Sequence, residues 1–234
     1  MIMKNRKNDP LNVLGIIPAR GGSKGIPKKN LIKINEKPLL YYTINASLSS
    51  RFVTKTIVTS DDATILKKTK ELGAIGIKRP QKLANSSSQI ESSIEYTLEY
   101  LKKHEKYVPD LIVLLQNTSP LRNAKHIDAA IQLLLKKKYD SVLSVFPSHY
   151  FLWTKKNYAK PVNYDPQNRI NRQNFKDQFI ENGAIFVTTL TAFQKSKCRI
   201  SGKIGLYVMK KMESFEIDDF DDLTLIRKLL GEKI

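Results

Sequence analysis

Short apolar runs alternate along the chain with longer segments in which apolar residues recur at every third or fourth position. The runs are rich in Val and Ile, a pattern typical of strands that are buried on both faces of a sheet. The predicted strands cover 13–18, 56–60, 74–77, 111–115, 141–146, 184–187 and 206–209. The helical spacing predicts helices at 39–48, 61–72, 88–103, 123–136 and 219–230. Strands and helices therefore alternate over most of the chain.

This alternation predicts an α/β fold of three layers, with a mostly parallel sheet between two layers of helices. Right-handed crossovers place the helices on both faces of such a sheet. Because the sequence has no internal repeat and no low-complexity linker, we expect a single domain over residues 1–234.

The alternation breaks between residues 147 and 180. This stretch is rich in aromatic, amide and basic residues and has no clear strand or long-helix pattern. It is too long for a plain connection within a compact domain. We expect either a functional excursion or an oligomerisation arm.

Composition narrows the class of protein. The 234 residues are 41% hydrophobic, which is enough for a core, and the single cysteine, Cys198, excludes an internal disulfide framework and a cysteine zinc site. No apolar run approaches the ~20 residues of a membrane span. The first nine residues are polar and basic, unlike a signal peptide. We therefore expect a cytoplasmic protein without a membrane partner.

The net charge of +18 raises the alternative of a basic α/β protein that binds nucleic acid. The lysines, however, are spread along the chain in ones, twos and threes, so we favour no nucleic-acid partner. An anionic small substrate fits the charge equally well.

A glycine-rich, cationic loop follows the first predicted strand. Residues 18–30 read Pro-Ala-Arg-Gly-Gly-Ser-Lys-Gly-Ile-Pro-Lys-Lys-Asn. Ligands of open α/β sheets bind at the carboxyl ends of the strands, and glycine-rich backbone with cations suits a phosphate. The segment lacks the Walker and dinucleotide-binding patterns. It does match the short G-x-S-x-G pattern of hydrolases, although Pro27 argues against the helix which that motif requires.

This loop and five later motifs resemble the acylneuraminate cytidylyltransferases, which include bacterial CMP-sialic acid synthetases and relatives acting on legionaminic and pseudaminic acids. The later motifs are Thr59-Ser60-Asp61-Asp62, Arg79-Pro80 with Leu83-Ala84, Gln116-Asn117-Thr118-Ser119-Pro120-Leu121-Arg122, Asn182-Gly183-Ala184-Ile185, and Glu216-Ile217-Asp218 with Asp222-Leu223. Their order and spacing match from about residue 13 to 230. The resemblance implies a nucleotide-diphospho-sugar transferase fold of Rossmann-like type.

It also implies a reaction in which the anomeric hydroxyl of a nonulosonic acid attacks the α-phosphorus of CTP and releases pyrophosphate. A cytidylyltransferase for another keto-acid sugar is the alternative. Arg20 and Lys24 are the implied catalytic cations. The implied nucleotide contacts are Ala19, Arg20, Gly21, Gly22, Ser23, Asn30, Arg79 and Ser88. Asn30 as a turn former and Ser88 as a helix cap are structural alternatives.

The resemblance implies a Mg²⁺ or Mn²⁺ site at Asp218, which it also counts as catalytic. Glu216 stands where the family usually has Asp, and it is the second candidate ligand. Asp219 and Asp222 fit the acidic start of the last helix better.

The implied contacts to the acid sugar are Gln116, Thr118, Ser119, Arg172, Asn182 and Phe186. Asn117 replaces the usual Pro of its motif, and Phe186 replaces a Tyr of some relatives. Arg172 would reach across a homodimer from the arm at 147–180, so that each subunit completes its partner's site. Trp153 fits the dimer interface better than substrate stacking. The general base and the identity of the acid stay open.

Overall fold

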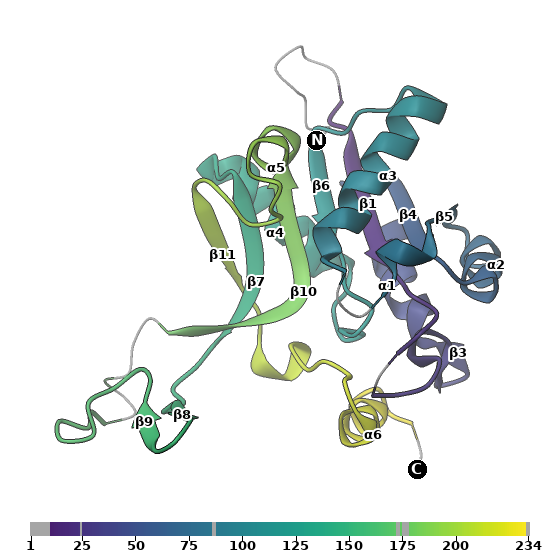
Figure 1. Ribbon diagram of the computed structural model, residues 1–234. Helices are drawn as coiled ribbons and strands as arrows, with labels where there is room; N and C mark the ends of the chain where they lie inside the picture. The colour runs from purple at the N-terminus through teal and green to yellow at the C-terminus, as the bar shows by residue number, and fades with distance from the viewer. Residues whose placement is uncertain (1–9, 24, 86–87, 172–173, 175–177, 233–234) are drawn as a thin grey trace.

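The computed structural model describes residues 10–23, 25–85, 88–171, 174 and 178–232. Its main sheet has the strand order β11-β7-β10-β6-β1-β4-β5 (Figure 1). The strands are β1 (Val13–Pro18), β4 (Lys55–Ser60), β5 (Ile75–Lys78), β6 (Leu111–Leu114), β7 (Ser141–Pro147), β10 (Phe179–Thr189) and β11 (Ile204–Val208). Each predicted strand is thus confirmed, with ends that differ by a few residues.

Strand β10 runs antiparallel to both of its neighbours, β6 and β7. The other neighbouring pairs of the main sheet are parallel. The prediction of a mostly parallel sheet is therefore confirmed. A register shift between Glu181 and Phe186 interrupts the β10–β7 pairing, and Gly183 adopts a φ of 63° within it.

Two layers of helices cover the sheet, as predicted. Helices α1 (Leu39–Leu48), α2 (Ala63–Glu71) and α4 (Ala124–Lys137) pack on one face, where Ile44, Ile65 and Ile131 share a core with Val13 and Val113. Helices α3 (Ile90–Glu105) and α5 (Leu190–Ser196) cover the other face through Ile94, Leu101 and Phe193. Helix α5 was not predicted, because its seven residues are too few for a clear helical period.

The last helix, α6 (Phe220–Leu229), packs beside the first loop rather than on the sheet. Ile226 shares a small core with Ile26, Ile34 and Leu39. A small hairpin, β2 (Lys33–Ile34) and β3 (Lys37–Pro38), lies between the loop and α1. Short 3₁₀ helices lie at Lys29–Leu31, Gln81–Leu83 and Lys211–Glu213.

The segment between β7 and β10 projects away from the sheet (Figure 1). Contrary to the sequence pattern, it contains a hairpin of β8 (Trp153–Lys155) and β9 (Ala159–Pro161). Tyr164 contacts the rings of Phe151 and Trp153, with centroids 4.5 and 5.9 Å apart, and the Arg169 guanidinium lies 4.2 Å from the Phe151 ring centroid. Local aromatic packing therefore gives the arm its structure.

None of the helices in the described part of the chain is both long and apolar enough to cross a membrane.

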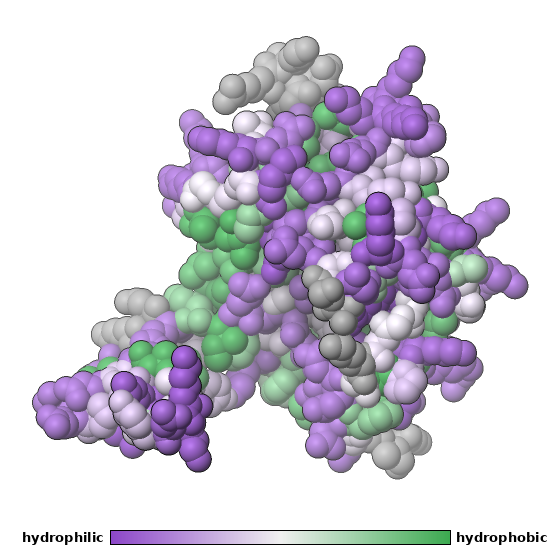
Figure 2. All heavy atoms as spheres, viewed as in Figure 1, coloured by the Kyte–Doolittle hydropathy of each residue, from purple (hydrophilic) through white to green (hydrophobic). Residues whose placement is uncertain are grey.

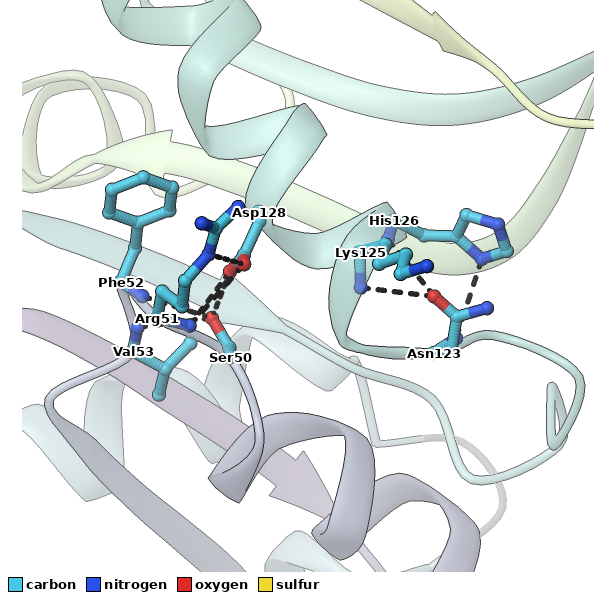
Figure 3. A network of polar contacts seen from close by, with 8 residues as sticks. All are labelled: Ser50, Arg51, Phe52, Val53, Asn123, Lys125, His126 and Asp128. Carbon is cyan, nitrogen blue, oxygen red and sulfur yellow. Dashed lines mark hydrogen bonds and ion pairs between the residues drawn. The ribbon is translucent and has the colours of Figure 1, made fainter.

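The turn after α1 is fastened to α4 by one buried carboxylate (Figure 3). Asp128 accepts hydrogen bonds from Ser50 Oγ at 2.6 Å and from the Arg51 backbone N–H at 3.1 Å. Asp128 is only 6% exposed, whereas the donors belong to the partly buried Ser50 and the exposed Arg51.

We therefore expect Asp128→Ala to lower the free energy of unfolding by about 1–3 kcal/mol, because it removes the hydrogen bonds that this carboxylate accepts from the turn. Urea denaturation measures this change. Arg51→Ala is the matched control, because its side chain is 80% exposed and its ion pair with Asp128 contributes at most about 1 kcal/mol. Equal losses in the two variants would contradict the assignment.

Candidate active site

The carboxyl ends of β1, β4 and β6 meet at one edge of the sheet, because β1 pairs in parallel with both of the other strands. A cavity of about 500 Å³ opens there. Among the predicted site residues, it is lined by Arg20, Ser23, Asn30, Gln116, Thr118 and Asp218. Residues from three distant segments of the chain thus come together, as the motifs predicted.

Hydrogen bonds and close contacts with neighbouring segments fix the backbone of the first loop. The Gly21 N–H donates to Asp61 Oδ1 at 3.0 Å, and a Cβ on Gly21 would lie 2.9 Å from the Asp62 side chain. A Cβ on Gly25 would collide with the backbone oxygen of Asp218. The Ala19 N–H donates to the Thr59 carbonyl at 3.0 Å. Glycine is therefore required at 21 and 25 by space, whereas nothing crowds Gly22.

Asn30 lies beneath this loop and is almost buried, at 8% exposure. Its Nδ2 donates to the Arg20 carbonyl at 2.8 Å, and its Oδ1 accepts from Asn117 Nδ2 at 3.1 Å. Asn30 therefore contacts both the first loop and the loop after β6, which goes beyond the turn-forming role considered as its alternative.

Lys29 also lines the cavity, although the sequence predicts no role for it. Its Nζ donates to the Ile217 carbonyl at 2.7 Å and lies 3.1 Å from Asp218 Oδ1. The Ile217 N–H in turn donates to the Thr118 carbonyl at 2.8 Å. These bonds join the segment before α6 to the other two loops. In the sequence, Lys29 could have been identified as a site residue from its position in the Pro-x-Lys-Asn end of the first motif.

Glu216 and Asp218 differ in their surroundings. Burial raises the pKa of the Glu216 carboxyl to about 7, and the negative charge of Asp218 adds to this shift. Ser119 Oγ donates a long hydrogen bond of 3.4 Å to Glu216 Oε1. The side chain of Asp218 is 73% exposed. Two carboxylates that repel each other beside a cavity are a suitable donor set for a divalent cation.

The described residues contain no cluster of three or more His, Cys, Asp or Glu side chains that would hold a metal unaided. Asp219 caps α6 by accepting from the Asp222 N–H at 3.0 Å, as the sequence indicated.

Of the predicted nucleotide contacts, Arg20, Ser23 and Asn30 line the cavity, whereas Ala19, Gly21, Gly22, Arg79 and Ser88 do not. Arg79 is 4% exposed and donates to Ser93 Oγ, and burial lowers its pKa. Ser88 Oγ donates to the Lys82 carbonyl at 3.0 Å. Ser88 is not the helix cap that we considered, because Gln89 holds that position in α3.

Three predicted sugar contacts are also absent from the cavity wall, namely the fully buried Ser119, Phe186 and Asn182. Phe186 is 1% exposed in the core below α3 and α5, with the Arg199 guanidinium 4.8 Å from its ring centroid. Asn182 is 3% exposed, and its Nδ2 donates to Ser214 Oγ at 2.8 Å while Ser144 donates to its Oδ1. The Phe186 and Asn182 side chains serve the core around β10. Lys24 and Arg172 lie outside the described residues.

Two buried polar atoms beside the cavity have no hydrogen-bond partner among the described residues. They are Asn117 Oδ1 and Thr118 Oγ1. Both residues belong to the cavity lining. Unpaired buried polar atoms are costly, so their presence beside a cavity is consistent with a ligand rich in hydroxyl groups.

A family model described as cytidylyltransferase matches residues 14–233. The chain belongs to the cytidylyltransferase family. N-acylneuraminate cytidylyltransferase A of Danio rerio is 33% identical over 220 residues, which are 92% of this chain and 49% of that protein. The N-acylneuraminate cytidylyltransferase of Escherichia coli O18:K1:H7 is 33% identical over 218 residues, 91% of this chain and 51% of the relative. This cytidylyltransferase chain spans about half the length of the curated relatives it matches.

Solved structures share the fold of this cytidylyltransferase at low sequence identity. CMP:2-keto-3-deoxy-manno-octonic acid synthetase complexed with CTP has a TM-score of 0.70 and 16% identity, and the match covers 95% of this chain and 100% of that one. 4-Diphosphocytidyl-2C-methyl-D-erythritol synthase has a TM-score of 0.69 and 11% identity, over 94% and 100% of the two chains. The predicted Rossmann-like nucleotidyltransferase fold is confirmed.

The raised pKa of Glu216 predicts how stability changes with pH in magnesium-free buffer. Between pH 4.5 and about 7, the unfolded chain releases this proton while the folded chain retains it. The folded state then binds more protons, so its stability falls as pH rises through this window. Glu216→Gln removes that contribution. We expect the variant's stability advantage over wild type to grow up to about pH 7 and then stay constant.

Urea denaturation at a series of pH values checks this, with the exposed Glu99→Gln as control. A stability difference that is independent of pH would contradict the raised pKa.

Proposed function

We propose that this cytidylyltransferase transfers CMP from CTP to the anomeric hydroxyl of a nonulosonic acid, in the cytoplasm, with release of pyrophosphate. The observation that carries the proposal is the cavity itself. A cationic, glycine-rich loop and a polar loop with unpaired buried atoms line it, together with Asp218, whose charge acts on the nearby Glu216 carboxyl. The names of the curated relatives support the same acid class.

The first loop would hold the triphosphate. The guanidinium of Arg20 can grip phosphate oxygens as a planar fork, and the backbone N–H groups of Gly22 and Ser23 lie beside it. Lys29 adds an ammonium group to the cavity wall, 3.1 Å from Asp218 Oδ1. These cations would stabilise the charge that develops on the departing pyrophosphate.

A magnesium ion would be held by Asp218, with Glu216 as a second ligand, and by phosphate oxygens of CTP. Mg²⁺ sites commonly use one or two carboxylates together with substrate phosphates. The ion would neutralise phosphate charge. Its charge would also offset the repulsion from Asp218, which adds to the effect of burial on the pKa of Glu216. Lys29 would then shift its ion pair from Asp218 toward the phosphates.

The acid would lie over Gln116, Thr118 and Ser119. The buried Thr118 hydroxyl has no partner among the described residues, and it could donate to or accept from a sugar hydroxyl once the side chain turns toward the cavity. The anomeric oxygen would form a bond to the α-phosphorus and release its proton to water, while the bond from that phosphorus to the oxygen bridging to the β-phosphate breaks and pyrophosphate departs. Because this step needs two reactants in line, the main contribution of the protein is positioning and charge stabilisation.

An assay of the purified chain tests the proposal. We expect CMP-sugar and pyrophosphate from CTP plus neuraminic, legionaminic or pseudaminic acid, and no product after removal of magnesium with a chelator. Arg20→Ala should lower turnover at saturating CTP by at least about a hundredfold, the usual effect of removing one charge-stabilising group.

The fold should be retained in Arg20→Ala, because the residue lies at the cavity surface. Circular dichroism checks this. A variant that keeps more than about a tenth of the wild-type rate would refute the role of Arg20. Turnover of an eight-carbon keto acid alone would favour the alternative substrate.

We further propose that the protein is a homodimer formed through the arm and the β11 edge of the sheet. One face of β11 presents Ile204, Leu206 and Val208, each more than 40% exposed. Figure 2 shows apolar side chains gathered over β7, β10 and β11 and continuing onto the arm. Monomers rarely leave such a face uncovered, and a two-fold mate commonly buries it. Arg172 from the partner's arm would then reach the acid.

Leu206→Glu should therefore give monomers at concentrations where wild type is dimeric, because the buried face would contain a charge. Sedimentation velocity measures the mass. Trp153 is the one tryptophan of the chain and is 53% exposed, so its emission should shift to longer wavelength when the dimer dissociates. Ile75→Glu, on the opposite edge strand β5, is the control and should leave the mass unchanged. Monomeric wild type would refute the dimer.

A further inference from the structure

Asn117 is the one residue of its motif that departs from the family pattern, and it makes a contact that Pro cannot make. Its Nδ2 donates to Asn30 Oδ1 at 3.1 Å, and Asn30 Nδ2 donates to the Arg20 carbonyl at 2.8 Å. Asn117 is 4% exposed and Asn30 is 8% exposed. The two amides form a short buried relay that joins the loop after β6 to the phosphate-binding loop.

The chemistry of the relay allows only one orientation of each amide. A backbone carbonyl can only accept, so Asn30 must present its NH₂ group to Arg20 and its oxygen to Asn117. Asn117 must then present its own NH₂ group to Asn30. This direction agrees with the unpaired atom, because the group left without a partner among the described residues is Asn117 Oδ1.

We infer that Asn117 is a positioning residue for CTP, which acts by fixing the amide of Asn30 and, through it, the carbonyl of Arg20. With Asn117 in place, the Asn30 amide cannot flip to turn its oxygen toward the Arg20 carbonyl. The second N–H of the Asn30 amide, which Arg20 does not use, is then the donor available to a ligand. The backbone that carries the Arg20 guanidinium is held in the same way. The relay therefore orders the nucleotide side of the cavity before CTP arrives.

Loss of the Asn117–Asn30 contact should weaken the binding of CTP and leave the binding of the acid unchanged. Asn30 and Arg20 belong to the first loop, whereas the proposed contacts of the acid in the cavity wall are Gln116 and Thr118. Without the relay the Asn30 side chain is free to rotate. CTP binding must then order this side chain, and the lost conformational entropy weakens the binding. The affinity for CTP should fall, and the KM for the acid should not change. This assignment rests on the proposed function in taking CTP as the nucleotide.

The test is a double-mutant cycle on Asn117 and Asn30, with the dissociation constant of CTP measured by calorimetry in the absence of the acid. Asn117→Ala should weaken CTP binding about fivefold, the usual effect of one hydrogen bond. Asn30→Ala should weaken it at least as much. The double variant should match Asn30→Ala within about twofold, because Asn117 acts only through Asn30.

A structural role of Asn117 elsewhere would give a different pattern. The two single effects would multiply, or the KM of the acid would rise together with the dissociation constant of CTP. Either result overturns the inference, as does unchanged CTP binding in Asn117→Ala. Should that variant fail to fold, Asn117→Ser replaces it, since the shorter hydroxyl does not reach Asn30. Asn123→Ala, which removes the cap of α4 outside the cavity, controls for general loss of stability.

The outcome is separable from that of the proposed function. Wild type that binds CTP but converts no keto acid refutes the proposed reaction and leaves the relay supported by the binding cycle. Wild type that does not bind CTP overturns both.

Discussion

The position of β1 between β4 and β6 is the constraint on which the site depends. Both pairings are parallel, with Pro18 opposite Thr59 and Ile16 opposite Leu114. Three loops therefore leave the sheet at the same edge, although they are up to about a hundred residues apart in sequence. The segment before α6 reaches this edge through Lys29 and the backbone of Thr118. The cavity is a consequence of strand order more than of any single motif.

The loop after β6 is also supported from inside the protein. The Arg122 side chain is 2% exposed, and it donates to Thr43 Oγ1 at 2.9 Å and to the Gln116 carbonyl at 3.2 Å. Complete burial lowers its pKa to about 9. No carboxylate among the described residues pairs with this guanidinium. A buried guanidinium without a paired carboxylate is costly, so the hydrogen bonds that Arg122 does make are important. One of them, to the Gln116 carbonyl, fixes the loop beside Asn117, where the family usually has Pro.

Much of the fold and of the site could be predicted, because each depends on local patterns. Buried parallel strands give continuous apolar runs, and Asp62 and Asp219 are caps that sequence alone identifies. The direction of β10 could not be predicted, since an apolar run looks the same in either direction. The motif resemblance identified the segments of the site, but not which side chains face the cavity. Phe186 and Asn182 lie one strand away from it and serve the core, whereas Lys29 and Asn117 contact the loops directly.

The antiparallel strand β10 has a consequence for the growing chain. Strand β6 has β1 on one side and β10 on the other, and β10 is also the neighbour of β7. On the ribosome, β1, β4, β5 and β6 can assemble early, but the open edge of β6 has no partner until residues 179–189 emerge. The arm is synthesised during this interval. The aromatic contacts of the arm join residues close in sequence. The arm can therefore fold locally before β10 pairs with β6.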